Sequence, residues 1–337
     1  MEPENILEIR DLEVHFRTYD GVVRGVDGVT LDVRKGETLG VVGESGCGKS
    51  VTAHSIMRLL PKRMATIHRG KIRFRRRNDE QVNLVDLDPN GALMRDIRGN
   101  EIAMIFQEPM TSLSPLHTIG DQITEAIMLH QYVDKSQAEE RAVAMLEAVR
   151  IGNPREFIRS YPHQYSGGMR QRAMIAMALS CNPLLLIADE PTTALDVTIQ
   201  AQILDLMRSL QDEFDSAIMM ITHNLGVINE MADRIAVMYL GKVVEIADRR
   251  TIFKNPAHPY TVGLLQSVPE MGNEQRTRLH PIPGIIPDPF NVPKGCAFFD
   301  RCPVKNKKSA CTDPAGVPLV EVEPGHHVRC TLYTEMN

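Results

Sequence analysis

One motif constrains the fold of this chain more than any other feature of its 337 residues. Residues 43–50 read Gly-Glu-Ser-Gly-Cys-Gly-Lys-Ser and match the phosphate-loop pattern G-x-x-x-x-G-K-[ST] without a mismatch. The apolar run 39–42 before the motif indicates a buried strand, and the pattern after Ser50 indicates a helix. Such a turn points backbone N–H groups at phosphate oxygens, and the helix N-terminus adds partial positive charge. A chance glycine turn would rarely keep strand, loop and helix in register.

The phosphate loop also predicts which residues contact a nucleotide and its metal ion. Lys49 is expected to reach the β- and γ-phosphates, and the Ser50 hydroxyl is expected to ligate Mg²⁺. Cys47 is interpreted as a small residue facing the cradle and not as a nucleophile. The residues expected to contact the nucleotide here are Gly43, Ser45, Gly46, Cys47, Gly48, Lys49, Ser50 and Val51.

An acidic pair follows the apolar run 184–188, which indicates a central strand. Asp189 stands at the carboxyl end of that strand, where α/β sheets bind ligands, and is expected to hold the Mg²⁺ shell. Glu190 is then placed to act as a general base on a water attacking the γ-phosphate. Acidic pairs after strands can also be plain helix caps. The phosphate loop upstream favours the catalytic interpretation.

A second glycine motif lies at 165–172, Tyr-Ser-Gly-Gly-Met-Arg-Gln-Arg. Ser166, Gly167 and Gly168 at a helix start present a hydroxyl and N–H groups to an anion. One chain cannot readily aim both glycine motifs at the same γ-phosphate. We therefore expect a dimer in which each Ser-Gly-Gly motif caps the nucleotide held by the other chain. Strand-like and helical segments alternate from 184 to 238, which predicts a parallel α/β sheet.

Together and in this order, these motifs resemble the ATP-binding cassette (ABC) family over residues 6 to about 265. Met169 stands where glutamine is commoner in that family. The resemblance implies ATP hydrolysis on a P-loop, RecA-like α/β fold. It implies an ATPase domain at 1–260 with a small helical subdomain at about 110–178, followed by a loop-rich metal-cluster extension at 261–337.

The resemblance also implies roles for four residues outside the glycine motifs. Gln107, in the segment 105–109, resembles the glutamine that senses Mg²⁺ and the attacking water. Asp196, in Ala194-Leu195-Asp196, is similar to the loop that crosses the dimer interface, and His223 resembles a histidine that contacts the γ-phosphate. For the aromatic that stacks on adenine, Tyr19 fits best and Phe16 is the runner-up. Either ring could instead pack at the strand edge.

Three stretches, 103–113, 188–202 and 255–261, resemble the dipeptide/oligopeptide importer branch more closely. That implies a translocase ATPase that works with two transmembrane permeases, a second related ATPase subunit or a second copy of itself, and indirectly an extracytoplasmic peptide-binding protein. The expected location is peripheral, on the cytoplasmic face of the plasma (inner) membrane. Other cargo of the branch, nickel or glutathione, is the alternative.

Composition and segment lengths weigh against other classes of protein. No apolar run approaches the ~18–20 residues of a membrane-spanning helix, and the acidic N-terminus lacks a signal-peptide pattern. The 38 basic and 43 acidic residues give a net charge of −5, which argues against a nucleic-acid partner. The short segment between Gln107 and Ser166 excludes the long coiled-coil insertions of DNA-repair relatives. A soluble nucleic-acid-linked or redox-sensing ATPase is the less favoured alternative.

The six cysteines divide unevenly along the chain. Cys181 is expected in the core, whereas four cysteines crowd the proline-rich tail (residues 281–337) with the spacing C-x5-C-x8-C-x18-C, namely Cys296, Cys302, Cys311 and Cys330. Four thiolates suit Zn²⁺ or an iron–sulfur cluster, and their spacing alone does not choose between them. The resemblance implies a [4Fe–4S] cluster, with zinc as the alternative. His326 and His327 are expected at the surface and not as ligands.

Overall fold

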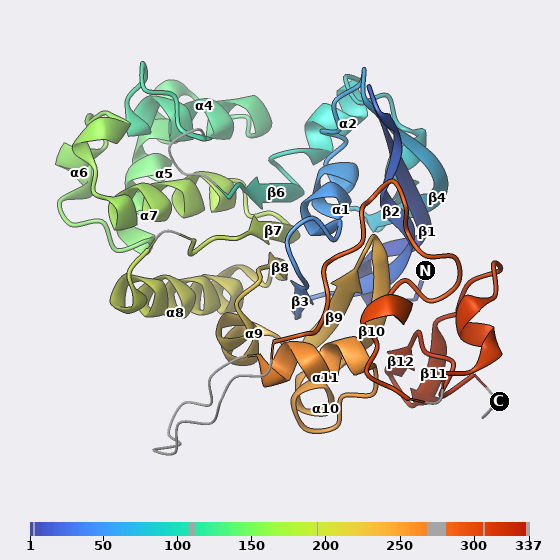
Figure 1. The fold of residues 1–337 in the computed structure, drawn as a ribbon. Helices are drawn as coiled ribbons and strands as arrows, with labels where there is room; N and C mark the ends of the chain where they lie inside the picture. Colours follow the sequence, from blue (N-terminus) through green and yellow to red (C-terminus); the bar gives the residue numbers. More distant parts are fainter. Residues whose placement is uncertain (3, 108–111, 194, 268–280, 306, 335–337) are drawn as a thin grey trace, which may run out of the picture. The chain divides into compact units, whose positions relative to one another are not determined.

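The computed structural model describes residues 1–2, 4–107, 112–193, 195–267, 281–305 and 307–334 (Figure 1). The chain divides into two compact units. The first unit contains Met1–Leu7, Asp32–Thr38 and Arg73–Ile221, and the second contains Glu8–Leu31, Leu39–Ile72 and Thr222–Asn337. Residues 108–111 and Ala194 of the family-like stretches lie outside the described residues.

The first unit is built on parallel strands in the order β8-β7-β6. These are β6 (Ile102–Ile105), β7 (Leu185–Asp189) and β8 (Ala217–Ile221). Every residue of β7 and β8 is buried, which explains why both read as unbroken apolar runs instead of alternating ones. The parallel α/β sheet expected from the sequence is confirmed here.

Helices make up most of the rest of the first unit, and several lie together in the green part of Figure 1. Two of them begin with capping boxes, Thr118 with Asp121 and Asp134 with Gln137, which satisfy backbone N–H groups at the helix starts. The helices are α2 (Ala92–Ile97), α4 (Ile119–His130), α5 (Lys135–Ala148), α6 (Pro154–Phe157), α7 (Gly167–Leu179) and α8 (Val197–Phe214). Short 3-10 turns lie at Leu84–Asp86 and Pro162–Gln164.

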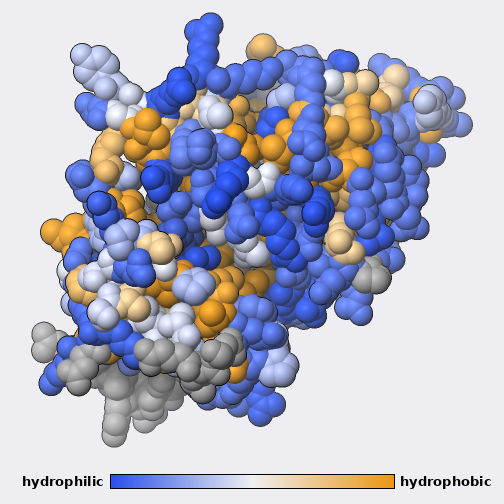
Figure 2. Space-filling model, turned by 90° about the vertical axis from the view of Figure 1, so that its right-hand side faces the viewer, coloured by the Kyte–Doolittle hydropathy of each residue, from blue (hydrophilic) through white to orange (hydrophobic). Residues whose placement is uncertain are grey.

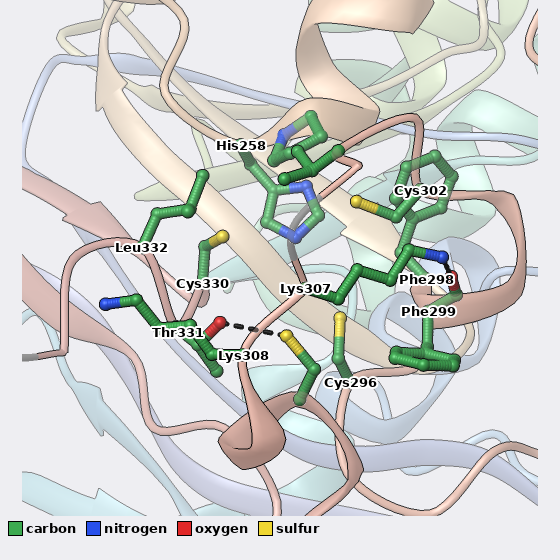
Figure 3. A pocket seen from close by; sticks show the side chains of 13 residues that line it. His258, Cys296, Phe298, Phe299, Cys302, Lys307, Lys308, Cys330, Thr331 and Leu332 are labelled. Carbon is green, nitrogen blue, oxygen red and sulfur yellow. Dashed lines mark hydrogen bonds between the residues drawn. The ribbon is translucent and has the colours of Figure 1, made fainter.

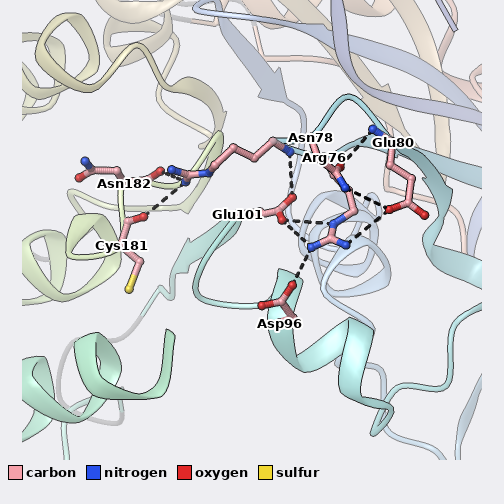
Figure 4. Close-up of polar contacts among 8 residues, drawn as sticks. Arg76, Asn78, Glu80, Asp96, Glu101, Cys181 and Asn182 are labelled. Carbon is pink, nitrogen blue, oxygen red and sulfur yellow. Dashed lines mark hydrogen bonds and ion pairs between the residues drawn. The ribbon is translucent and has the colours of Figure 1, made fainter. Parts of the chain in front are cut away.

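An ion-pair network holds the start of β6 in place within the first unit (Figure 4). The Arg76 guanidinium donates to Glu101 Oε1 at 2.7 Å and to Asp96 Oδ2 at 2.6 Å. Arg77 donates to the backbone oxygen of Asn182 at 2.6 Å. Because Glu101 is buried, its charge needs these donors, and its carboxylate in turn raises the pKa of Arg76.

The second unit carries the phosphate loop and a mixed sheet in the order β11-β12-β10-β9-β3. β3 (Thr38–Val42) runs parallel to β9 (Arg234–Tyr239), while β10 (Lys242–Asp248), β12 (His326–Val328) and β11 (Val320–Glu323) are antiparallel to their neighbours. Its helices are α1 (Lys49–Ile56), α9 (Leu225–Met231), α10 (Arg249–Lys254) and α11 (Pro259–Gln266).

The proline-rich tail is less irregular than its composition predicts. Residues 281–305 and 307–319 contain only the 3-10 turns Phe299–Arg301 and Ser309–Thr312, as a loop-rich segment should. The hairpin β11–β12 was not predicted. It forms because β12 pairs with β10, with Glu245 opposite Val328, so the tail extends a sheet that already exists.

A four-stranded sheet has the order β2-β1-β4-β5. Its strands are β1 (Asn5–Thr18), β2 (Gly21–Arg34), β4 (Ala65–Arg75) and β5 (Gln81–Asn83). Because of its basic residues, the segment 71–75 reads as an edge strand. That interpretation is wrong, because β4 lies between β1 and the short β5.

Surface hydropathy can be followed on one face in Figure 2, where hydrophilic residues cover most of the area and apolar residues form separate patches. Within the described part of the chain, no helix combines the length and the apolar character needed to cross a membrane.

Candidate nucleotide site and four-cysteine cavity

The phosphate loop joins β3 to α1, and two of its glycines are required by the surrounding backbone. Gly43 has φ +154° and Gly48 has φ +102°. A Cβ at Gly43 would lie 2.2 Å from the Met238 carbonyl oxygen, and one at Gly48 would lie 2.4 Å from that of Gly25. The loop is therefore held by main-chain neighbours that leave no room for a side chain.

Lys49, the first residue of α1, is buried and lies across this loop. Its Nζ donates to the backbone oxygens of Gly43 at 2.8 Å and Glu44 at 3.1 Å. Ser50 follows on the same helix, with Val51 next to it. Cys47 is buried, and its burial raises the pKa of the thiol, which agrees with a packing role and not a nucleophilic one.

Two other predicted nucleotide contacts also belong to the second unit. His223 is exposed and lies just before α9, whose first turn is capped by the Asn224 side chain. The Tyr19 ring is fully exposed, so it does not pack at the strand edge. The runner-up ring, Phe16, packs against Gly25 of β2: a Cβ added at Gly25 would be 2.7 Å from the Phe16 ring and 3.6 Å from the Val51 side chain of α1.

The end of β7 in the first unit brings two predicted catalytic residues together. Asp189 is buried at the last position of the strand. Glu190 follows with φ +49°, a left-handed conformation that costs a non-glycine residue free energy. Its Oε2 accepts from Gln107 Nε2 at 3.2 Å and from the Thr193 hydroxyl at 2.8 Å. Two neutral donors therefore orient the carboxylate.

Thr193 is a functional candidate that sequence reasoning missed. The sequence offered one clue, which is that Thr193 lies three residues after Glu190. Because Glu190 has a left-handed backbone, the Thr193 hydroxyl reaches its carboxylate. The backbone N–H of Glu190 also donates to the Ile221 carbonyl at 2.8 Å. Side-chain and main-chain contacts together fix Glu190 before any substrate contact is considered.

The Ser-Gly-Gly motif forms the start of α7, also in the first unit. Ser166 caps the helix by accepting from the Met169 N–H, and both Ser166 and Gly167 are exposed. A Cβ at Gly168 would lie 3.0 Å from Ile199 of α8, so this glycine allows the two helices to approach closely. Asp196 caps α8 by accepting from the Ile199 N–H at 3.0 Å. The exposed cap leaves Ser166 accessible to another molecule.

The four cysteines of the tail line one small cavity of ≈ 20 Å³, together with His258 and Phe298. Figure 3 shows the thiols of Cys296, Cys302 and Cys330 directed into this space, while the Cys311 thiol lies 3.0 Å from the Thr331 hydroxyl. Burial and the neighbouring cysteines raise the pKa of Cys296 to about 11. As placed, the described residues form no group of three or more His, Cys, Asp or Glu side chains able to hold a metal ion.

His326, expected at the surface, is buried, so that expectation is wrong. Its Nε2 lies 2.8 Å from Glu245 Oε1, and Glu245 is itself fully buried. The same carboxylate accepts from the N–H groups of Ala257 and His258, which helps to lower its pKa against the effect of burial. His326 is buried because its strand, β12, pairs with β10, which holds Glu245. Cys181 is buried in the core, as expected.

The comparisons with known proteins agree with this fold. The family model described as ABC transporter matches residues 26–193, and the model described as the oligopeptide/dipeptide transporter C-terminal region matches 244–311. A probable peptide ABC transporter ATP-binding protein, y4tR of Sinorhizobium fredii, is 51% identical, covering 98% of this chain and 96% of its own length. The dipeptide transport ATP-binding protein DppD of Bacillus subtilis is 49% identical, covering 98% of this chain and 93% of its own.

A solved structure shares the fold as well. The dimeric ATP-binding cassette MJ0796, bound to ADP and Pi, matches with a TM-score of 0.63 and 25% identity, covering 72% of this chain and 99% of its own. The chain belongs to the ABC transporter family, and it carries the C-terminal region of that family's oligopeptide/dipeptide transporters. The family and branch predicted from the motifs are thereby confirmed, and so is the P-loop α/β fold.

Proposed function

We propose that this chain is the ATP-hydrolysing subunit that energises a membrane importer of dipeptides or oligopeptides. The observation that carries the proposal is the Glu190 carboxylate at the end of β7, oriented by Gln107 at 3.2 Å and Thr193 at 2.8 Å. A preformed phosphate loop accompanies it, and relatives of about the same length are named peptide and dipeptide transport ATP-binding proteins.

In this proposal the phosphate loop binds the nucleotide and Glu190 acts on water. The N–H groups of the loop and Lys49 hold the β- and γ-phosphates, and Glu190 accepts the proton of the attacking water. Gln107 keeps the carboxylate and the water aligned, and His223 contacts the γ-phosphate. Mg²⁺, held by the Ser50 hydroxyl, Asp189 and Gln107, would neutralise charge on the phosphates. Tyr19, whose ring is fully exposed, is proposed to stack on adenine, with Phe16, whose ring packs against Gly25, as the runner-up.

The site is proposed to be completed by a second ATPase subunit, either a related chain or another copy of this one. The support is the exposed Ser166 cap on α7 and the likeness to a cassette solved as a dimer. Ser166, Gly167 and Gly168 would bind the γ-phosphate held by the partner, and Asp196 at the start of α8 would lie at the interface. Two composite sites per dimer follow from this arrangement.

The remaining partners follow from the same branch. Two transmembrane permeases would bind the ATPase dimer at the cytoplasmic face of the plasma membrane, and an extracytoplasmic peptide-binding protein would deliver cargo to them. The ATPase domain is proposed to span 1–260, with its helical subdomain at about 110–178, and the extension to span 261–337. A nucleic-acid partner is not part of the proposal.

A soft-metal centre in the four-cysteine cavity is part of the proposal. Four thiols that share one cavity are the donor set that iron–sulfur clusters and zinc prefer. The cavity of ≈ 20 Å³ has room for about one water molecule or ion, so zinc needs the smaller rearrangement. A [4Fe–4S] cluster, the occupant we favour, requires the larger rearrangement of the thiols. Broad absorption near 400 nm with bound iron supports the cluster, and colourless protein with stoichiometric zinc rejects it.

Glu190→Gln tests the catalytic proposal. The amide cannot accept the proton, so turnover should fall by about 10²–10⁴-fold while ATP binding is retained. The measurement is phosphate release by the purified importer, together with nucleotide binding by the same sample. Glu139→Gln, an exposed change on α5, is the matched control and should keep the parent rate. A parent-like rate in Glu190→Gln would remove Glu190 from its role.

Cargo is tested separately by uptake. Cells that lack this chain should lose accumulation of labelled dipeptide or oligopeptide, and a copy of the chain should restore it. Restoration of nickel or glutathione uptake, with peptide uptake unchanged, would keep the ATPase and reject the peptide cargo.

A further inference from the structure

The phosphate loop carries an acidic residue that the tail neutralises. The Glu44 carboxylate accepts from both terminal nitrogens of Arg301, at 2.7 Å from Nη1 and 3.0 Å from Nη2. Both residues belong to the second unit and lie far apart in the sequence. A guanidinium that holds two carboxylate oxygens at once is the strongest common form of ion pair, and it fixes orientation as well as charge.

Arg301 is held rigidly in place on its own side. It is buried, and its Nε donates to the Pro283 carbonyl at 3.1 Å. Its guanidinium carbon lies 5.7 Å from the centre of the Tyr239 ring and 5.9 Å from that of Phe298, in cation–π range. The Phe298 and Tyr239 rings meet edge to face at 5.3 Å. The arginine is therefore positioned before it meets Glu44.

Glu44 is also fixed through its main chain. Its N–H donates to the Tyr260 hydroxyl at 3.0 Å, and its carbonyl accepts from Lys49 Nζ at 3.1 Å. Glu44 is thus a structural part of the phosphate cradle, and its carboxylate adds negative charge next to a loop that must attract phosphate. Without a compensating cation, that charge would repel a triphosphate and compete for Lys49.

We propose that Arg301 is a positioning residue for nucleotide binding, which the tail supplies to the phosphate loop by neutralising and orienting Glu44. The inference rests on the proposed function, namely that this loop binds ATP. It assigns the tail an indirect part in ATP affinity, through a residue that belongs to none of the nucleotide motifs. Arg301 acts through Glu44 and needs no contact with ATP.

A charge-removal cycle on the full-length subunit tests this. Arg301→Gln leaves Glu44 uncompensated, so the Kd for ATP should rise about tenfold, and in the importer KM should rise while kcat stays within about twofold. Adding Glu44→Gln removes the offending charge, so the double variant should return to within about threefold of the parent Kd. Arg301→Lys keeps the charge but loses the paired geometry, so its Kd for ATP should lie between those of the parent and Arg301→Gln.

Controls separate this role from a merely structural one. Arg329→Gln is the matched control, since Arg329 donates to the carbonyls of Val243 and Val317 and not to the loop; its Kd should match the parent even if its thermal midpoint falls. An Arg301→Gln variant that binds ATP like the parent overturns the proposal. So does a double variant as weak as Arg301→Gln alone. If Lys49→Ala also binds ATP like the parent, the nucleotide site itself is wrong, which is a different failure.

Discussion

The phosphate loop and the four-cysteine cavity, both in the second unit, are built by opposite means. The loop is a run of consecutive residues whose shape is set by main-chain neighbours, the carbonyls of Met238 and Gly25, which exclude a Cβ at Gly43 and Gly48. The cavity is made by side chains from separated positions, His258 and four cysteines of the tail, and the described residues between 281 and 319 form only short 3-10 turns. The backbone alone therefore gives the phosphate loop its shape, whereas the cavity depends on how its side chains are held.

This difference has a consequence for what each site tolerates. A site made of backbone fails when a side chain intrudes, whereas a site made of side chains fails when a donor is removed. The tail compensates for its few regular elements with specific anchors: β12 paired to β10, Phe298 packed on Tyr239 and Tyr260, and Arg301 bound to Glu44.

The largest expected effect is that of Gly43→Ala on nucleotide binding. The added methyl group would lie 2.2 Å from the Met238 carbonyl oxygen and 2.7 Å from the Cys47 sulfur, so the loop must shift. We expect the Kd for ATP to rise at least about 100-fold, because the N–H groups no longer converge on phosphate. Equilibrium titration with a labelled ATP analogue measures it.

Gly46→Ala is the matched control in the same loop. A Cβ there meets nothing within 4 Å, so its cost is only that of a left-handed residue at φ +80°, about 1–2 kcal/mol. Binding should weaken but remain measurable. Equal losses of ATP affinity in the two variants would show that the loop needs glycine for its flexibility, and not because the neighbouring backbone excludes a Cβ.

The second prediction concerns donor removal in the tail. Cys296→Ser keeps the size of the side chain but replaces a soft sulfur donor with a poor one, so bound iron or zinc should fall from stoichiometric to near zero. Losing a bound metal also removes its stabilisation of the folded tail, so the thermal midpoint should fall by several degrees. Elemental analysis and a thermal scan of the same preparation measure both.

Cys181→Ser is the control for the chemical change itself. Cys181 is a buried thiol, whereas Cys296 is only partly buried, and Cys181 lies in the first unit, where its thiol donates to the Ala126 carbonyl at 3.6 Å. Its metal content should equal that of the parent. A parent protein without iron or zinc, purified under nitrogen, would reject the metal centre for both variants.

The same contrast explains what could be predicted from the sequence. The phosphate loop and the strand before Asp189 are local patterns, since consecutive residues determine both their shape and their chemistry. The hydrogen bond from Gln107 to Glu190 and the ring of Phe16 beside Gly25 are not local, because they depend on which strands become neighbours. Neither contact could therefore be predicted without the structure.

The tail shows the limit more sharply. Composition predicted its loops, but not the hairpin β11–β12, because pairing with β10 stabilises strands too short to be recognised alone. The inward position of His326 follows from that register and from Glu245, which sits on β10, far away in the sequence. A histidine beside a second histidine in a polar segment offers no signal of that burial.

The smallest expected effect concerns a single side chain that contacts the phosphate loop. The Tyr260 hydroxyl of α11 accepts from the Glu44 N–H at 3.0 Å, so Tyr260→Phe leaves that donor without its partner while keeping the ring packed against Tyr239 and Phe298. The loss should cost about 1 kcal/mol, or about 2–4 °C in thermal midpoint, and weaken ATP binding by a few-fold at most. Tyr333→Phe, whose hydroxyl makes only a long 3.5 Å contact with the Ala257 carbonyl, is the control and should change neither value. If Tyr260→Phe instead matches Gly43→Ala in its loss of binding, the loop depends on a side chain of α11 for its shape, and the distinction between a backbone-built site and a side-chain-built site fails.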